Sequence, residues 1–539
     1  MKKIINIFLL LSVLIMTSCY NLTETNLNPN GTPVENANPN LLMSTILTES
    51  AMLNLSFGFE NMGPLMQHTQ NIEHSSVNDY NMSGRGWEGY YSILNNNKVM
   101  YKIAVRDNLE FHQGVALVMK SFLYGQITDL YGDAPYTEAL RASDDDPIIT
   151  PIYDNQEIIY RGIIEDLKKA EGLLSKRASA YPGIYKETDV YYHGDPTKWR
   201  KFANSLLLRY YMRLSEKLPG FASDGIREII NNSKPIMEGI DDDAIMAYIG
   251  TNSSSSWPTN SHFDDPMKYN QTQMCGTLVD TLRSLSDPRL AIWAEPIAIK
   301  TVMDPAHNYA HNDTTSVPGT RFMHPEEVDM ANINLNEDYV GIVKNLRYPY
   351  SYNYNDEPGP EGKNKYVSHL NKRYMKSDGP LLNAILMTSS EVNFILAEAA
   401  QRGWIGNAIN YYNTAIELSF TYWSVGGDYA AYISKPAVAY DGTLERIMEQ
   451  KWIASWSVEQ ESWCDYRRTG LPKLETGDNA IRPVYPLRFL YGSDELTENN
   501  IKCTDAISKL ETTEYTRDDN LGEAFSRSWL YQGTNVPWQ

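Results

Sequence analysis

Cysteine, basic side chains and long apolar runs are all scarce in this chain of 539 residues. It has 4 Cys, too few for a disulfide-rich scaffold, and the three beyond the N-terminus, Cys275, Cys464 and Cys503, allow at most one disulfide. With 47 Lys and Arg against 67 Asp and Glu, the net charge is −20, and a field of that sign repels the phosphates of nucleic acids. Past the N-terminus no run of about 18 apolar residues occurs, so we expect no membrane-spanning helix there.

The rest of the composition is that of a folded protein. Hydrophobic residues make up 42% and charged residues 21%, which argues against wholesale disorder. Among the aromatic residues, 37 Tyr stand against 13 Phe. Tyrosine suits either a buried position with a bonded hydroxyl, the commoner case, or an exposed binding surface.

The first twenty residues have the pattern of an export signal. Two lysines precede the apolar run Ile4–Met16, which is too short to cross a hydrocarbon core of about 30 Å. The following Thr17-Ser18-Cys19 resembles a bacterial lipobox, in which the cysteine is lipidated and becomes the first residue of the mature chain. The sequence therefore predicts a signal peptide over residues 1–18 and a lipidated, flexible tether over residues 19–40. Ordinary signal cleavage, with Cys19 unmodified, is the alternative.

Amphipathic helices dominate the readable part of the chain. Asp195-Pro196 is an N-cap followed by proline at the first helical position, and apolar side chains then recur every three or four residues over Trp199–Tyr210. Asp154 and Thr388 each begin a pattern that resembles a capping box. Over Glu391–Phe420 we expect two antiparallel helices with small residues where they meet.

Such helix pairs need neighbours to bury their outer faces, so several should stack. The predicted fold is mainly α, with tetratricopeptide-like helical pairs, long irregular loops and little β structure, in one large domain over residues 41–539. Three long loops rich in Asn, Ser, Pro, Gly and Tyr separate the helices: Gly250–Gln273, Asp304–Pro325 and Tyr348–Asn364. Loops of this length are usually functional or disordered.

Motifs of catalysis and of cofactor binding are weak in this sequence. Gly84–Gly89 fits G-x-G-x-x-G, but no buried strand precedes it, so dinucleotide binding is not expected. The acidic runs Asp144–Asp146 and Asp241–Asp243 lack the pattern of a calcium loop and are interpreted as solvated turns. We therefore predict no enzyme, no cofactor and no metal site. The 67 acidic residues nevertheless leave paired carboxylates for glycoside hydrolysis open.

A binding surface for sugars or peptides is better supported. A sugar ring has an apolar C–H face and a polar rim, so flat aromatic rings and Asn, Asp or Arg side chains can hold it. The segment Asn78–Tyr91 combines such residues with three glycines, and a tryptophan in a polar loop has no periodic reason to be buried. The candidate ligand-binding residues are Asn78, Asp79, Arg85, Trp87, Tyr90 and Trp257.

Trp87 and Tyr90 can instead pack at the base of the helix that follows them. A further segment alternates tyrosine with other residues and is a weaker candidate surface; its members are Tyr348, Tyr350, Tyr352 and Tyr354.

Several motifs along the chain, together with the lipobox-like start, resemble the SusD/RagB family of nutrient-binding outer-membrane lipoproteins of Bacteroidetes. They are Ser121–Tyr136, which ends in Tyr-Gly-Asp-Ala-Pro-Tyr; Asp287–Arg289; Glu391–Ala399, with Phe-Ile-Leu-Ala-Glu-Ala; Ala408–Ile416; Glu449–Ala454; and Asp465–Gly470. The resemblance implies a tetratricopeptide-containing α fold. It also implies a SusC-like TonB-dependent transporter as partner, over which the lipoprotein sits as a hinged lid. The ligand is typically an oligosaccharide, and in some members a peptide.

The favoured function is therefore a lipid-anchored receptor of the outer membrane, facing the cell exterior, that binds a nutrient and performs no catalysis. Two other classes stay open. A lipid-anchored glycoside hydrolase would release product from a polysaccharide, and a helical-repeat scaffold would bind only protein.

Overall fold

The computed structural model describes residues 37–72, 78–306, 317–355, 364–516, 522–535 and 537–538. The predicted signal peptide and Cys19 lie outside the described residues, as does the tether up to residue 36. The first described helix begins at Pro39, within the last residues of the predicted tether. Among the described helices, none is both long and apolar enough to span a membrane.

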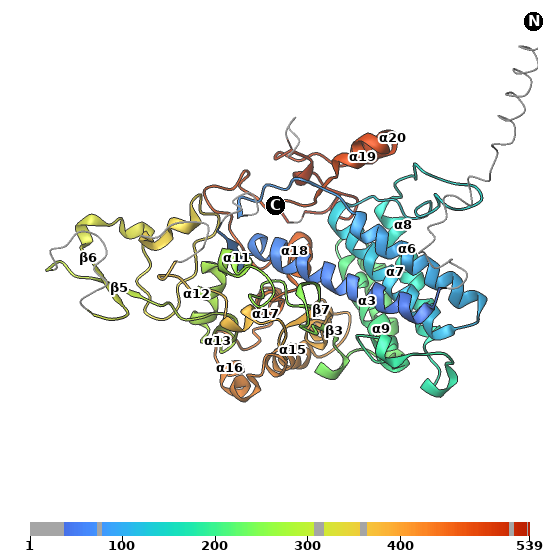
Figure 1. Ribbon diagram of the computed structural model, residues 1–539, viewed down its shortest axis with the longest axis horizontal. Helices are drawn as coiled ribbons and strands as arrows, with labels where there is room; N and C mark the ends of the chain where they lie inside the picture. Colours follow the sequence, from blue (N-terminus) through green and yellow to red (C-terminus); the bar gives the residue numbers. More distant parts are fainter. Residues whose placement is uncertain are drawn as a thin grey trace, which may run out of the picture.

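One end of the molecule is a layer of helices that pack in chain order. In Figure 1 they lie to the right: α3 (Pro39–Leu55), α6 (Glu88–Arg106), α7 (Glu110–Tyr131), α8 (Gln156–Leu173), α9 (Pro196–Arg213) and α10 (Pro219–Asn231). Each of α6 to α9 packs on the next, and α3 packs on α6. The expected cap of α9 is confirmed, because Asp195 Oδ1 accepts the Thr197 N–H at 2.8 Å. For α8 the cap is Asn155 rather than the expected Asp154, whose carboxylate instead accepts the N–H groups of Tyr136 and Thr137.

The second helical group contains the expected tetratricopeptide-like pair. Helix α14 (Ser389–Gln401) packs along α15 (Ala408–Tyr422), and Thr388 caps α14 by accepting the Glu391 N–H at 3.1 Å. Helix α17 (Leu444–Ala454) packs on α14, and α18 (Glu459–Thr469) follows it. The shorter helices are α4 (Gly63–Leu65), α11 (Met267–Gln271), α12 (Gly276–Ser284), α13 (Leu290–Trp293), α16 (Tyr429–Ile433), α19 (Ser493–Glu498) and α20 (Asn500–Ser508).

Within the described residues the strands form only two-stranded ladders, and isolated bridges join a few other segments. Antiparallel pairs join β1 (Thr69–Asn71) to β4 (Thr272–Met274) and β3 (Ala244–Ala247) to β7 (Asn383–Met387). Parallel pairs join β2 (Gly84–Arg85) to β8 (Leu490–Tyr491) and β5 (Lys300–Met303) to β6 (Thr320–Met323). The prediction of a mainly α fold with tetratricopeptide-like pairs and little β structure is confirmed.

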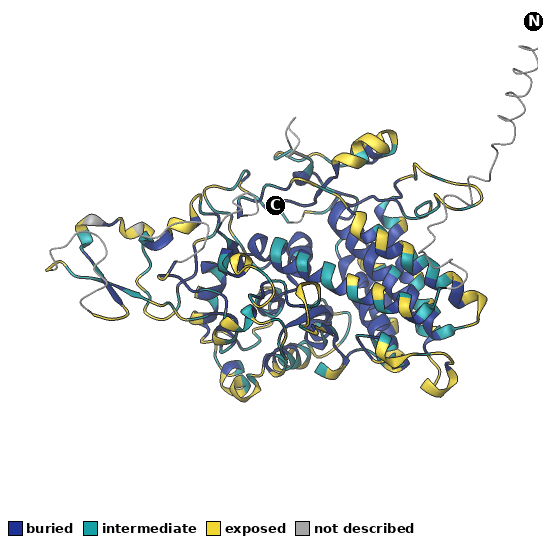
Figure 2. Ribbon diagram, in the orientation of Figure 1, coloured by how far each residue is buried: buried dark blue, intermediate teal, exposed yellow. Residues whose placement is uncertain are grey.

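The lobe that carries β5 and β6 extends away from the helical body, at the opposite end of the long axis from α6 to α8 (Figure 1). Figure 2 shows the helices buried where they face one another, whereas much of this lobe is exposed. A small apolar cluster is separate from the main core and contains Ile72, Val340, Ile342, Tyr352 and Val367. Ile72 directly follows β1, so this second packing centre lies beside the end of that strand.

The three described cysteines, Cys275, Cys464 and Cys503, are buried and free. No pair of them forms a disulfide, so stability rests on packing and on polar contacts.

Candidate functional site

Each of two hollows is lined in part by one of the long loops, and the first also adjoins the ladder of β1 and β4. The first, here called the polar hollow, has a volume of ≈ 290 Å³. Its lining comes from the segment after α3, from β1, and from α11 with β4: Glu60, Asn61, Pro64, Thr69, Asn71, Thr259, Lys268, Gln271 and Thr272. Most of these side chains carry an amide, a hydroxyl or a charge, so the hollow suits a ligand rich in hydroxyl groups.

A π-helical segment places two of these side chains. Ser56–Met62 continues α3 without a break as a π-helix, a rare form that is frequent at functional sites. It carries Glu60 and Asn61 into the lining of the polar hollow. The turn packs tightly beside Gly58, where an added Cβ would come within 2.4 Å of Gln460 Oε1. Close packing therefore holds the π-turn in place.

The polar hollow combines paired charges with a hydroxyl that has no partner. Lys268 Nζ lies 3.3 Å from Glu60 Oε1, so the two charges largely compensate each other. The buried Thr69 hydroxyl has no hydrogen-bond partner among the described residues. A ligand hydroxyl placed there would satisfy it, because a buried polar group normally has a partner.

The second hollow, here called the tyrosine hollow, has a volume of ≈ 310 Å³. It is lined by Asn332, Leu346, Arg347, Tyr348, Ser351, Tyr352, Asn353 and Tyr354. Tyr348 is 53% exposed, and the Arg347 guanidinium lies 5.4 Å from the centre of its ring. Tyr350 is also exposed, with its ring 6.1 Å from that of Tyr348. The row of tyrosines noted in the sequence thus gathers in and beside one hollow.

A buried arginine supports the backbone of this hollow. Asn353 and Tyr354 have φ of 57° and 52°, a left-handed conformation that is uncommon outside glycine. Arg321 donates to both of their carbonyl oxygens at 2.8 Å. Its guanidinium also lies 3.5 Å from the centre of the Tyr366 ring. These contacts fix a strained turn, and with it the orientation of Tyr352 and Tyr354.

Asn78 and Asp79 lie beside the two hollows. The Asn78 side chain exchanges hydrogen bonds with the backbone of Asn71, at 2.6 and 3.1 Å, and Asn71 lines the polar hollow. The Asn78 backbone carbonyl accepts a hydrogen bond from Asn345 Nδ2 at 2.8 Å. Asn345 directly precedes Leu346, which lines the tyrosine hollow. Burial raises the pKa of Asp79, although the positive charge of Arg347 acts to lower it. The two side chains therefore interact electrostatically. The structure therefore places both predicted residues next to the hollows.

Arg85 and Trp257 stand behind the polar hollow rather than in it. Arg85 Nη1 donates to Asn61 Oδ1 at 2.7 Å, and Trp257 Nε1 donates to Thr259 Oγ1 at 2.9 Å. The expectation that Trp257 lies open in a polar loop is wrong, because its side chain is 1% exposed. Three aromatic rings enclose it, Tyr248 from the preceding strand region and Phe59 and Tyr374 from distant segments.

Trp87 and Tyr90 line neither hollow. Trp87 is the residue before α6, is 5% exposed, and donates from Nε1 to Glu495 Oε1 at 2.9 Å. Tyr90 lies in the first turn of the same helix and is buried. The alternative interpretation, in which both residues pack at the base of α6, matches these positions.

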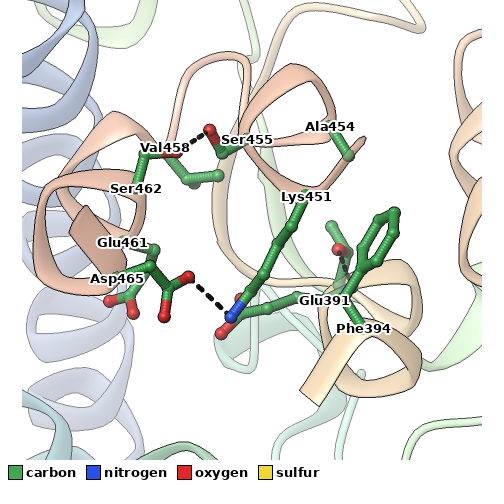
Figure 3. A pocket seen from close by; sticks show the side chains of 10 residues that line it. Glu391, Phe394, Lys451, Ala454, Ser455, Val458, Glu461, Ser462 and Asp465 are labelled. Atoms are coloured by element: carbon green, nitrogen blue, oxygen red, sulfur yellow. Dashed lines mark hydrogen bonds and ion pairs between the residues drawn. The ribbon is translucent and has the colours of Figure 1, made fainter. Parts of the chain in front are cut away.

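A cluster of buried charges between α14, α17 and α18 is closed to a ligand. Figure 3 shows Glu391, Lys451, Glu461 and Asp465 converging from α14, α17 and α18 on a cavity of ≈ 20 Å³, about the room that one water needs. Lys451 Nζ lies 2.7 Å from Asp465 Oδ2. A sugar ring does not fit into this space, so these carboxylates are placed to hold the helices together and not to cleave a glycan.

Arginines compensate the acids of this cluster. Arg213 donates to Glu461 at 2.6 Å, and Arg209 donates to both oxygens of Glu391. Although burial acts to raise the pKa of Glu461, Arg209 and Arg213 hold it below its ordinary value. In the part of the chain that the structure describes, no group of three His, Cys, Asp or Glu residues is arranged to hold a metal ion.

Comparisons with known proteins agree with this architecture. A family described as starch-binding and associating with the outer membrane matches residues 31–315 and 321–492. Among solved structures, a SusD homologue from Bacteroides fragilis shares 22% identity with a TM-score of 0.71, covering 92% of this chain and 100% of that chain. An outer-membrane protein of Bacteroides vulgatus, described as involved in nutrient binding, shares 23% identity with a TM-score of 0.70 over 92% and 100% of the two chains.

A third structure is a chitin-binding SusD homologue from Flavobacterium johnsoniae. It shares 21% identity with a TM-score of 0.65, covering 91% of this chain and 97% of that chain. No curated protein matches the sequence significantly.

Proposed function

The chain belongs to the SusD-like family of starch-binding proteins that associate with the outer membrane, and on this premise we propose that it captures an oligosaccharide in its two hollows. In this proposal Cys19 carries a lipid anchor, the protein faces the cell exterior, and a SusC-like TonB-dependent transporter receives the ligand. The protein acts as the lid of that transporter and breaks no bond. Ligand contacts with both lid and transporter would favour the closed state by population shift.

The observation that carries the proposal is the exposed ring of Tyr348 above the tyrosine hollow. A flat ring that is 53% exposed offers a stacking surface for the apolar face of a sugar. Arg347 beside it can donate to ring hydroxyls, and Asp79 nearby can accept from them. One aromatic platform with donors and acceptors at its edge is the combination that a sugar needs.

The polar hollow supplies further contacts of the same kind. Its Glu60–Lys268 pair is balanced in charge, so it does not select for a charged ligand. Amides and hydroxyls make up most of the remaining polar groups, and the Thr69 hydroxyl is without a partner among the described residues. A neutral oligosaccharide with donors and acceptors on every ring suits this lining better than an ion does.

Calorimetric titration of the mature protein with maltoheptaose and with chitohexaose tests the proposal. We expect one of them to bind saturably, and Tyr348→Ala to weaken that binding about tenfold or more. Tyr185→Ala is the matched control, because Tyr185 is also 53% exposed but lies elsewhere, beside the 3-10 turn Lys186–Thr188. Equal affinity in the two variants would remove the tyrosine hollow as the site. Release of shorter sugars by the purified protein would favour the hydrolase instead.

The anchor and the partner have their own tests. Cys19→Ala should move the protein from the membrane fraction to the soluble fraction, and intact-mass analysis should find acyl chains only on the unaltered protein. Copurification of a large β-barrel transporter with the tagged receptor would support the lid role. A mature N-terminus without lipid would overturn the anchor and leave the sugar site to be judged separately.

A further inference from the structure

A second pair of hollows adjoins α6, and the larger lies among α6, α7 and α8. These three helices are at the end of the molecule opposite the lobe of β5 and β6 (Figure 1). The larger has a volume of ≈ 270 Å³ and is bounded by these three helices and the loop after α7. The smaller, of ≈ 150 Å³, is bounded by the start of α6, the same loop and α19. Ala139 and Leu140 line both, so the two hollows adjoin on either side of this loop. Together they are called the helix groove here.

A run of aromatic rings connects the two parts of the helix groove. Trp87 contacts Tyr91, Tyr91 contacts Tyr124, and Tyr124 contacts Tyr136, with ring centres 5.6, 6.2 and 4.7 Å apart. Trp87 and Tyr91 line the smaller hollow, whereas Tyr124 and Tyr136 line the larger. Aromatic surface is therefore present along the length of the groove.

The backbone that separates the two hollows is strained. Leu140 has φ of 61°, a conformation that a branched side chain adopts rarely. Its carbonyl accepts a hydrogen bond from Lys98 Nζ, which also lies 3.0 Å from Asp144 Oδ1. Strain of this kind persists only where surrounding contacts enforce it, and it clusters at binding sites.

The larger hollow contains a buried acceptor that lacks a partner. Asn97 is 3% exposed and donates from Nδ2 to the Ala116 carbonyl at 2.8 Å. Its Oδ1 has no hydrogen-bond partner among the described residues. A buried acceptor without a partner is unfavourable, and a ligand with a hydroxyl or amide N–H would satisfy it.

The charges of this hollow are balanced. The ammonium groups of Lys98 and Lys120 are each paired with a carboxylate, Asp144 at 3.0 Å and Asp166 at 2.8 Å. Neither an anion nor a cation would find an unpaired counter-charge here. A group that both donates and accepts hydrogen bonds, such as a sugar hydroxyl, can bond to the ammonium and carboxylate groups without separating them.

We propose that the helix groove is a second binding site, distinct from the tyrosine and polar hollows, and that it takes a short neutral oligosaccharide. The larger hollow is just below the range of about 300–1,000 Å³ that is common for small-molecule sites, so it accommodates one ring. The next ring lies over Ala139 in the smaller hollow, beside Trp87. Two separate sites on one receptor would let it hold a long glycan at both ends, with a gain in avidity.

A blocking substitution in the shared loop tests the proposal. Ala139→Trp fills the junction of both hollows from a half-buried position, and Ala142→Trp, in the same loop and exposed, is the matched control that lines neither. Both are made in a Tyr348→Ala background and titrated with maltose and with chitobiose. We expect binding to persist with Ala142→Trp and to weaken at least about tenfold with Ala139→Trp.

Fluorine NMR of 5-fluorotryptophan-labelled protein provides a readout that needs no blocking substitution. Trp87 lines the smaller hollow and Trp257 supports the polar hollow, and each resonance is assigned through its Trp→Phe variant. A shift of the Trp87 resonance on adding disaccharide supports the second site. A Trp87 resonance that stays in place while that of Trp257 moves overturns the second site and leaves the proposed function intact. If neither resonance moves, the second site is rejected for these sugars.

Discussion

The buried charge cluster of α14, α17 and α18 and the tyrosine hollow use polar side chains in opposite ways. In the cluster every carboxylate has a cation within hydrogen-bond distance, and the space between them holds about one water. In the hollow the exposed Tyr348 ring and the Arg347 guanidinium line ≈ 310 Å³ of open space, and the Asp79 carboxylate lies nearby. Polar groups that satisfy one another hold a fold together, whereas polar groups that face open space are available to a ligand.

This difference bears on the hydrolase alternative. The 67 acidic residues left catalytic pairs open, but the acids of this buried cluster are paired with Arg209, Arg213, Arg468 and Lys451. Breaking a buried pair by removing one partner is strongly destabilising, because it leaves a charge without compensation. The following substitutions test whether the two regions really divide stability and binding between them.

The largest effect is expected from Glu461→Ala. Glu461 lies within 2.6 Å of Arg213 and 3.5 Å of Arg209, and its loss leaves two buried guanidinium groups undercompensated. We expect the free energy of unfolding to fall by about 3–5 kcal/mol, measured by urea denaturation. Asp505→Ala is the control, because its pair with Lys509 is exposed and should be worth less than about 1 kcal/mol. Similar losses of unfolding free energy in both variants would show that the buried cluster stabilises the fold no more than an exposed ion pair does.

A smaller loss is expected from Arg321→Met, which removes the donor of two carbonyl hydrogen bonds beneath the tyrosine hollow. Leaving the Asn353 and Tyr354 carbonyls without this donor should cost about 1–3 kcal/mol of unfolding free energy. Because the turn that these residues form would then relax, sugar affinity should fall as well. A variant that loses stability and keeps full affinity would show that the strained turn does not shape the site.

Tyr348→Ala should separate binding from stability completely. We expect a loss of about tenfold in affinity, equivalent to about 1.4 kcal/mol, with unfolding free energy unchanged within about 0.5 kcal/mol. The half-exposed ring makes few core contacts, so its removal leaves no buried cavity. Thermal unfolding and calorimetry on the same sample measure both quantities. A clear fall in the free energy of unfolding would show that Tyr348, like Arg321, stabilises the fold.

The sequence was most informative where local chemistry decides the structure. The caps at Asp195 and Thr388 and the helix pair after Glu391 follow from short-range patterns, and the structure confirms them. For α8 the pattern was one residue off: Asn155 caps the helix while Asp154 bonds the turn after α7. Asp154 and Asn155 are both residue types that can cap a helix. The hydrogen bonds of Asp154 to the turn after α7 leave Asn155 as the cap.

The candidate site was harder to predict, because it is assembled from segments far apart in the chain. Trp257 sits in a polar loop, yet rings from distant segments enclose it, and no local period encodes that contact. The strand pair of β1 and β4 likewise brings Asn71 beside Thr272. Conversely, the row of tyrosines that begins at Tyr348 was the weaker candidate from the sequence. It lies at a hollow because a strained turn brings its members together. The residue types that can bind a ligand could be identified from the sequence, but which of them are exposed could not be predicted.

The smallest effect, and the one with the most diagnostic sign, is expected from Asp79→Asn. Burial raises the pKa of Asp79 above 3.8 against the pull of Arg347, so its folded-state pKa exceeds the unfolded one. Wild-type stability should therefore fall slightly as pH rises through that folded pKa. Glu461 of the charge cluster behaves in the opposite way. Arg209 and Arg213 outweigh burial and lower the pKa of Glu461, so its contribution is lost as pH falls.

The Asn variant should accordingly be more stable than wild type at pH 7, by less than about 1 kcal/mol since Asp79 is only half-buried, and equal to it near pH 3. Urea denaturation at the two pH values measures this difference. If the same variant also binds sugar more weakly, the chain retains at this position an acid that costs stability and serves the ligand, the usual trade-off at a binding site. A variant that is less stable at pH 7 would instead mean that Asp79 is held by Arg347 as part of the fold, and that the division between the two regions does not extend to it.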